Sequence, residues 1–298
     1  MFDFKNIVKK YNYTEEFSAL LNKIYYSLIN YYGNEKIIYN AFLNTEIKNV
    51  DDIYGYLFNN NLLDESGLVS IGDIKRSSGI YVSEPIIDKN NDKYTIKEVK
   101  RVVLVKDFDI NNVNKQAILI HELCHMVKSF ENEYIVDKDI LLNSSGLIKR
   151  KYKLKYEAIV KKELIEEKAV GLEEGFTTLS EECIVRDIID KSYNQSGYGP
   201  VYILAKKLLD VISEDIVLDA QMHHDKNILS EYISNYENLE DLSDIIYKLN
   251  LQMYKKAFDP EILDDIKNKI IKIIKEKYIP ILENNKKKGR RKWNCMMN

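Results

Sequence analysis

The segment His121-Glu122-Leu123-Cys124-His125 restricts most strongly what this chain can fold into. The residues around it keep helical spacing, because apolar side chains recur there every three or four positions (Leu119, Leu123, Met126, Val127 and Phe130). Residues four apart lie one turn above each other on a helix, so His121 and His125 present their imidazoles on one face. The fold must therefore supply partners for three polar groups on a helix that otherwise reads as buried, since unpaired groups there are costly.

Two imidazoles on one rigid helix face are half of a tetrahedral zinc site, and we expect one zinc ion per chain. Glu122 follows the first histidine directly and can reach a water on the metal as a general base. The alternative interpretation is a buried helix whose two histidines are merely hydrogen-bonded. A zinc site also needs a third protein ligand, which must come from elsewhere in the chain.

Length, charge and cysteine usage limit the class of protein. The chain has 298 residues, enough for one large domain or two modest ones. The net charge of −3 does not favour a nucleic-acid partner. We expect no membrane span and no secretory signal, since no stretch is long and apolar enough. Cys124, Cys183 and Cys295 show no disulfide-like spacing, so we expect a cytoplasmic protein.

The N-terminal residues 1–70 read as a helical part that packs without chemistry. Apolar residues keep helical spacing over 15–32, with Thr14 as its N-cap, and shorter helices are expected over 35–43 and 51–58. The scarcity of Gly (11) and Pro (4) also favours a mostly helical protein with few tight turns.

β-Branched residues predict strands in the middle of the chain. Residues 80–82 and 102–105 form two such runs. Over 148–156 the apolar residues fall on one face of a period-two pattern (Ile148, Tyr152, Leu154 and Tyr156) and the lysines at 149, 151, 153 and 155 fall on the other. This pattern predicts a half-buried strand, in a hairpin inserted after the motif helix. The lysines are better explained as protection of an edge strand against aggregation than as a substrate-binding site.

A second amphipathic helix over 172–189 can supply the third ligand. Leu172, Phe176, Leu179 and Cys183 share one side, and Gly171 is expected to break an earlier helix over 163–168. The other side carries four glutamates (Glu173, Glu174, Glu181 and Glu182). One of them can complete a catalytic His₂Glu site with a water in the fourth position, and the others read as a solvated helix face.

The segment Leu172-Glu173-Glu174-Gly175-Phe176-Thr177 resembles the sequence around the third zinc ligand of gluzincin metallopeptidases. This resemblance implies that Glu174, the glutamate before the glycine, is the zinc ligand. It also implies an α+β, mostly helical fold, with a zincin-like catalytic core over 71–190, a small mixed sheet flanked by helices, and an edge strand along the substrate cleft. Many gluzincins place an aspartate where this chain has Thr178, so either Glu181 or a backbone carbonyl must orient the histidine.

Gluzincins commonly place a tyrosine or histidine downstream of the third ligand to stabilise the oxyanion. The resemblance makes Tyr198, in the loop over 193–200, the first candidate for a second catalytic residue. Tyr202, Tyr193 and His223 follow, and simple packing is the alternative for each tyrosine. His223 and His224 are otherwise expected at the surface or at a helix end.

The C-terminal part over 191–285 is expected to be a helical subdomain. Helices are predicted over 201–213, after Pro200 in the first turn, over 239–258, and over 261–283, with Asp259 as N-cap. Pro280 is expected to kink or end the last of them. The basic tail 286–298 is interpreted as a solubilising extension, with contact to nucleic acid or anionic lipid as the alternative.

Together these features predict a zinc metallopeptidase that hydrolyses a peptide or protein substrate. His121, His125 and Glu174 are the expected metal ligands, and Glu122 is the expected base. Two alternatives stay open: a zinc-containing regulatory or binding protein without turnover, and a toxin-like protease with one protein substrate. The intact Glu122 speaks against the first, because a structural site does not need that carboxylate.

Overall fold

The chain folds into an α+β structure of two compact units. The computed structural model describes residues 2–63, 71–90, 93–131, 133–157, 159–194, 199–255 and 259–285. Unit 1 comprises residues 1–145, 149–167 and 180–193, and unit 2 comprises 146–148, 168–179 and 194–298. Helix α7 (Val170–Ile188) runs through both units. The basic tail over 286–298 lies outside the described residues.

Among the described residues up to Arg76, five helices belong to unit 1, and local capping fixes the starts of the second and third of them. They are α1 (Phe4–Tyr11), α2 (Glu15–Tyr32), α3 (Glu35–Asn44), α4 (Ile53–Asn59) and α5 (Ile71–Arg76). Thr14 accepts a hydrogen bond from the backbone N–H of Phe17, and Asn34 accepts one from Ile37, so each side chain satisfies a donor that the first helical turn leaves over. The three helices expected here are confirmed, with ends shifted by at most two residues.

In the described part of the chain, sheet A contains three strands in the order β1-β3-β2. β2 (Gly79–Asn90) runs antiparallel to β3 (Lys93–Lys106), as the β-branched runs predicted, although both strands are longer than expected. β1 (Glu46–Val50) pairs parallel to β3 and was missed, because five residues between two helices carry no period of their own. Residues 1–63 are therefore not entirely helical.

Both faces of sheet A are covered, which explains its continuous apolar run. Val102 and Leu104 pack with residues of α4 and α5, in a cluster with Ile53, Leu57, Leu62 and Ile74. Gly79, which pairs with Val105 in the sheet, faces α6 (Val113–Ser129), so the odd-numbered residues of this segment point to the other side. All four residues from Val102 to Val105 are consequently buried.

Over the residues that the structure describes, sheet B has four strands, in the order β4-β5-β6-β7, rather than the expected hairpin. The strands are β4 (Tyr134–Asp137), β5 (Ile140–Ser145), β6 (Ile148–Glu157) and β7 (Ile159–Lys168). The helix expected over 163–168 is wrong, since these residues belong to β7. Glutamate and lysine favour helix locally, but pairing and packing in a sheet override that preference.

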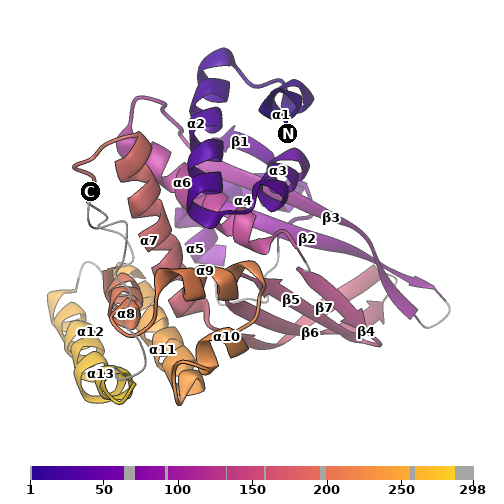
Figure 1. Ribbon diagram of the computed structural model, residues 1–298. Helices are drawn as coiled ribbons and strands as arrows, with labels where there is room; N and C mark the ends of the chain where they lie inside the picture. The colour runs from indigo at the N-terminus through magenta and orange to yellow at the C-terminus, as the bar shows by residue number, and fades with distance from the viewer. Residues whose placement is uncertain are drawn as a thin grey trace. The chain divides into compact units, whose positions relative to one another are not determined.

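The alternation predicted for β6 is confirmed up to Leu154, but Tyr156, which was expected on the buried face, is exposed. Tyr152 and Leu154 are buried with Leu141 against the far ends of β2 and β3, where they meet Ile87, Tyr94 and Ile96 (Figure 1). The lysines at 151, 153 and 155 alternate with them and are exposed. Sheet B therefore has an apolar inner face that packs on the long hairpin of sheet A, and a lysine-bearing outer face.

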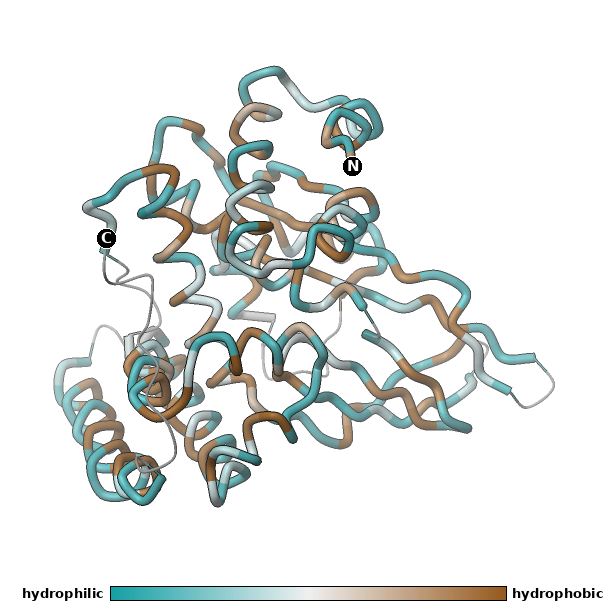
Figure 2. The backbone as a smooth tube through the Cα atoms, in the orientation of Figure 1, coloured by the Kyte–Doolittle hydropathy of each residue, from teal (hydrophilic) through white to brown (hydrophobic). Residues whose placement is uncertain are grey.

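The helices of unit 2 are α8 (Gly199–Leu209), α9 (Glu214–Met222), α10 (Asn227–Ser230), α11 (Tyr236–Lys255), α12 (Pro260–Ile273) and α13 (Ile279–Glu283). A π-helical turn, Ile274–Tyr278, joins α12 to α13, and Pro280 lies directly after this turn, in the first turn of α13. Asp259 caps α12 as predicted. Apolar and polar residues alternate along α12 with helical period (Figure 2).

Gly171 does not break a helix but lies in the first turn of α7. A Cβ there would come within 2.2 Å of the carbonyl oxygen of Ser243 on α11, so only glycine allows this close approach. The carboxylate of Asp244 accepts the N–H groups of Ala169 and Gly171 at 2.9 and 2.8 Å. The start of α7 is therefore fixed by a residue about 75 positions downstream, so the sequence around Gly171 could not predict it.

Candidate metal centre

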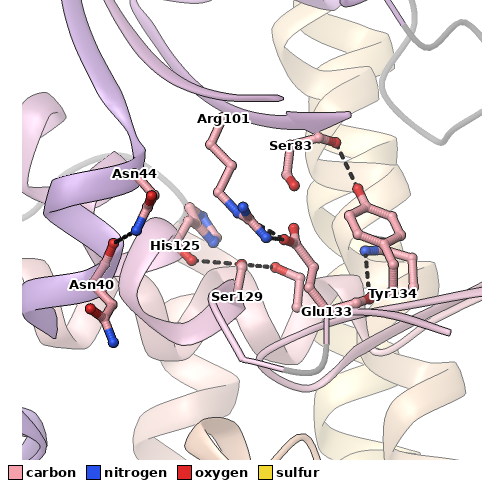
Figure 3. A network of polar contacts seen from close by, with 10 residues as sticks. Asn40, Asn44, Ser83, Arg101, His125, Ser129, Glu133 and Tyr134 are labelled. Carbon is pink, nitrogen blue, oxygen red and sulfur yellow. Dashed lines mark hydrogen bonds and ion pairs between the residues drawn. The ribbon is translucent and has the colours of Figure 1, made fainter. Parts of the chain in front are cut away.

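Helix α6 holds the histidine motif on a rigid support. Asn112 caps its first turn by accepting from the N–H of Lys115, and Leu119, Leu123 and Met126 are fully buried. At its other end, the hydroxyl of Ser129 donates to the carbonyl of His125 at 2.6 Å (Figure 3). The helix predicted around the motif is confirmed.

His121 and His125 direct the same ring nitrogen toward each other. Their Nε2 atoms are 3.2 Å apart, their ring centroids are 4.9 Å apart, and the ring planes differ by 71°. Two nitrogens bound to one tetrahedral zinc at roughly 2.0–2.1 Å would lie about 3.3 Å apart. The pair is thus arranged as two ligands of one metal ion would be.

Glu174 completes a group of three possible metal ligands. One atom from each of His121, His125 and Glu174 can be chosen such that all three lie within 4.8 Å of one another. No other group of three such residues meets this criterion in the described part of the chain. Two nitrogens and a carboxylate oxygen are the donor set of catalytic zinc sites, so these residues fit that ion.

Glu181 contacts His121 on the ring nitrogen that faces away from His125. Its Oε2 lies 3.0 Å from Nδ1 of His121, and the side chains of both residues are almost fully buried. A carboxylate in this position favours the tautomer with hydrogen on Nδ1, which leaves the Nε2 lone pair for a metal. Of the two options for orienting the histidine, the structure shows the carboxylate of Glu181. Thr178 instead donates to the backbone carbonyl of Glu174 at 2.8 Å.

Glu174 and Glu181 share one face of α7. Seven residues amount to about 700° of helical rotation, so the two side chains leave the helix within roughly 20° of each other. The contact between Glu181 and His121 therefore turns the face that carries Glu174 toward the same histidine. Glu173 leaves the helix about 100° away from Glu174.

Glu122 is fixed against the strand β2. Its Oε2 accepts the backbone N–H of Tyr81 at 2.7 Å, and the side chain is only partly exposed. One carboxylate oxygen is thus tied to the strand that lies next to α6. A carboxylate held in this way, next in sequence to His121, is suited to proton transfer.

The other glutamates of α7 are not a solvated face, which corrects that expectation. Glu173 is fully buried, where it accepts from the N–H of Leu147 at 2.8 Å and from Nε2 of Gln221 at 2.9 Å. Glu182 is also buried and pairs with Arg186 at 2.5 Å. A signal for this burial was present, since no lysine or arginine occurs between Lys168 and Arg186. A solvated helix usually mixes both charge signs.

The described candidates for a second catalytic residue each have their own contacts. Tyr198 lies outside the described residues. The hydroxyl of Tyr193 donates to Oε1 of Glu181 at 2.6 Å, and that of Tyr202 lies 3.1 Å from Nζ of Lys206. His223 is exposed at the end of α9, which confirms the expected helix-end position.

A buried ion pair that sequence reasoning missed lies just beyond α6. Arg101 on β3 donates to Oε2 of Glu133 from Nε and from a terminal nitrogen, at 3.2 and 3.0 Å (Figure 3). Burial raises the pKa of Glu133 to about 7, although Arg101 acts in the opposite direction. The neighbouring hydroxyl of Tyr134 donates to the carbonyl of Ser83 at 2.7 Å, so β4 is also tied to β2.

No helix of the described residues is long and apolar enough to cross a membrane. Comparison of the chain with protein-family models, with curated proteins and with solved structures gave no match.

Proposed function

We propose that this chain is a zinc-dependent peptidase whose metal is held by His121, His125 and Glu174. The observation that supports this most strongly is the combination of the grouped ligands with a carboxylate, Glu122, on the same helix turn as the first of them. Zinc bound by such residues supplies Lewis acidity, which polarises a carbonyl and lowers the pKa of water. A purely structural site would have no use for Glu122.

In this proposal Glu122 moves the protons of the reaction. It takes a proton from the water that attacks the peptide carbonyl, so that a C–O bond forms. It then delivers that proton to the nitrogen of the leaving amine as the C–N bond breaks. The N–H of Tyr81 keeps the carboxylate in one orientation throughout, which reduces the reorganisation needed before reaction.

The position of β2 favours a peptide as the substrate. β2 lies at the end of the strand order in sheet A, and among the described residues no strand of that sheet pairs with its outer side. An extended peptide can add to such an edge through backbone hydrogen bonds, although the N–H of Tyr81 and the carbonyl of Ser83 are already used by Glu122 and Tyr134. Because Tyr81 of β2 binds Glu122, a peptide on this edge would pass close to the base.

The test combines metal content with turnover. We expect about one zinc per purified chain and cleavage within a diverse peptide library. Glu122→Gln keeps the shape of the side chain but removes the base, so zinc should remain while cleavage falls by at least about a hundredfold. Glu98→Gln, which changes an exposed glutamate on β3, is the matched control and should keep full activity.

Each outcome selects between the alternatives. Zinc without cleavage of any library peptide by the wild-type chain would favour either a non-catalytic zinc protein or a protease with one protein substrate. Equal cleavage by wild type and Glu122→Gln would remove Glu122 from the mechanism, and absence of zinc would overturn the metal centre.

A further inference from the structure

The two carboxylate oxygens of Glu181 bind two different partners. Oε2 faces Nδ1 of His121 at 3.0 Å, and Oε1 accepts the hydroxyl of Tyr193 at 2.6 Å. The Glu181 side chain is only 4% exposed, so water offers little replacement for either bond. The carboxylate therefore cannot rotate away from His121 without also breaking its bond to Tyr193.

Tyr193 is itself held against α7 by the turn that follows this helix. Its backbone carbonyl accepts from Nε of Arg186 at 2.7 Å, and its N–H donates to the carbonyl of Asp190 at 3.0 Å. The side chain of Asp190 accepts from the N–H and the hydroxyl of Ser192, which stabilises the turn. The phenol thus reaches Glu181 from a backbone that is fixed at both its N–H and its carbonyl.

The electrostatic surroundings keep the Tyr193 hydroxyl in its donor form. Burial raises its pKa well above the ordinary value for tyrosine, and the neighbouring Glu181 carboxylate raises it further. Arg186, the nearby cation, is engaged by Glu182 and by the carbonyl of Tyr193. The hydroxyl therefore stays protonated and can donate to Glu181 across the physiological range.

From these contacts we propose that Tyr193 is a positioning residue of the metal centre. It fixes Glu181, and Glu181 fixes the ring orientation and tautomer of His121, so that Nε2 is presented to the metal. This inference rests on the proposed zinc site and assigns a residue that does not touch the metal. It also removes Tyr193 from the candidates for an oxyanion donor, because its hydroxyl is used on the Nδ1 side of His121, away from Nε2.

Tyr193→Phe removes only the hydroxyl, so it isolates this link. Changes among residues that support metal ligands typically weaken metal binding by about 10- to 100-fold, and we expect that range for the zinc dissociation constant, measured by competition with a chromophoric chelator. Tyr134→Phe is the matched control, since it also removes one buried hydroxyl in unit 1, with its bond to Ser83. We expect its zinc affinity to stay within about twofold of wild type. An equal loss in both variants would indicate general destabilisation and overturn the proposal.

A double-mutant cycle tests whether Tyr193 acts through Glu181. In a Glu181→Gln background, Tyr193→Phe should weaken zinc binding by less than about twofold, because the carboxylate that it positions is gone. A full additional loss in that background would place Tyr193 on another route and overturn the proposal.

Nitrogen NMR of the histidines gives a readout that does not depend on metal. In metal-free wild-type protein we expect the His121 tautomer with hydrogen on Nδ1, and a mixture of tautomers in Tyr193→Phe. If wild type binds no zinc, the proposed function fails, while this NMR comparison still decides the role of Tyr193. Identical tautomers in both proteins, together with unchanged zinc affinity, would contradict that role.

Discussion

Gly79 of β2 leaves the space into which Glu122 of α6 fits. A Cβ on Gly79 would lie 3.1 Å from Cγ and 3.3 Å from Oε1 of Glu122, and 2.5 Å from Cγ2 of Ile118. Two residues further along β2, the N–H of Tyr81 binds the same carboxylate. The strand thus provides both the room for the Glu122 side chain and the hydrogen bond that orients its carboxylate.

Gly79→Ala is therefore expected to disturb the base without touching a metal ligand. Ile118 is β-branched and stiff, so part of the required shift falls on Glu122. Because a displacement of about 1 Å near the chemistry can cost roughly a hundredfold in rate, we expect turnover to fall at least about tenfold with zinc retained. Steady-state kinetics and metal analysis measure this. Ile118→Ala, which opens space instead of filling it, serves as control, and full turnover of Gly79→Ala would show that the contact is unimportant.

Alanine substitutions of Glu173 and Glu174, which are adjacent on α7, should have opposite effects on zinc binding and on the free energy of unfolding. Glu174→Ala should abolish stoichiometric zinc binding while metal-free stability changes little. Glu173→Ala leaves the buried donors of Leu147 and Gln221 without their acceptor, at about 1–3 kcal/mol each, so it should lower the free energy of unfolding by about 2–6 kcal/mol. Denaturant titration in chelator and zinc analysis separate the two effects. Zinc lost from a folded Glu173→Ala protein, and kept by Glu174→Ala, would exchange the assignments.

The raised pKa of Glu133 predicts how stability depends on pH. Its pKa is about 7 in the folded protein against 4.5 as the ordinary value, so the folded state binds the proton more tightly. The stability that this preference contributes is complete below about pH 4.5 and is lost as pH rises through 7, a change of about 3 kcal/mol. Arg101, Arg150 and Tyr81 face this group, and burial outweighs the two cations.

The comparison of wild type with Glu133→Gln isolates this effect. The variant cannot titrate at this position, so the wild-type free energy of unfolding should fall relative to the variant between pH 5 and 8. Denaturant titrations in chelator remove the contribution of metal binding. Parallel pH profiles would mean that Arg101 keeps Glu133 charged throughout.

Tyr198 remains the first candidate for the oxyanion donor, on the gluzincin resemblance alone. Loss of such a donor typically costs about 2.7–4 kcal/mol in activation free energy, so Tyr198→Phe should lower turnover by about 10²- to 10³-fold with zinc content unchanged. Tyr202→Phe is the comparison variant. It also removes one tyrosine hydroxyl, which contacts Lys206 on the same helix, α8. Full activity of Tyr198→Phe would return this residue to a packing role.

What the sequence alone determined is the set of elements whose signal is local. The spacing of apolar residues defined α2, α6 and α7, and side chains adjacent in sequence cap their neighbours, as Thr14 caps α2. The four-residue spacing of His121 and His125 on a helix already placed both rings on one face, and 3.6 residues per turn requires this in any fold. The β-branched runs of β2 and β3 are also local signals, because these residue types favour strands.

Tertiary structure decided everything that depends on a distant partner. β1 exists because β3 pairs with it, β7 is a strand because a sheet overrides its helical composition, and α7 begins where Asp244 binds its first N–H groups. Whether a glutamate of α7 is a ligand, a support for His121 or a buried acceptor depends on what packs against each face. Glu173, Glu174 and Glu181 have the same chemistry in the sequence, and only the surroundings that long-range packing gives each carboxylate distinguish them.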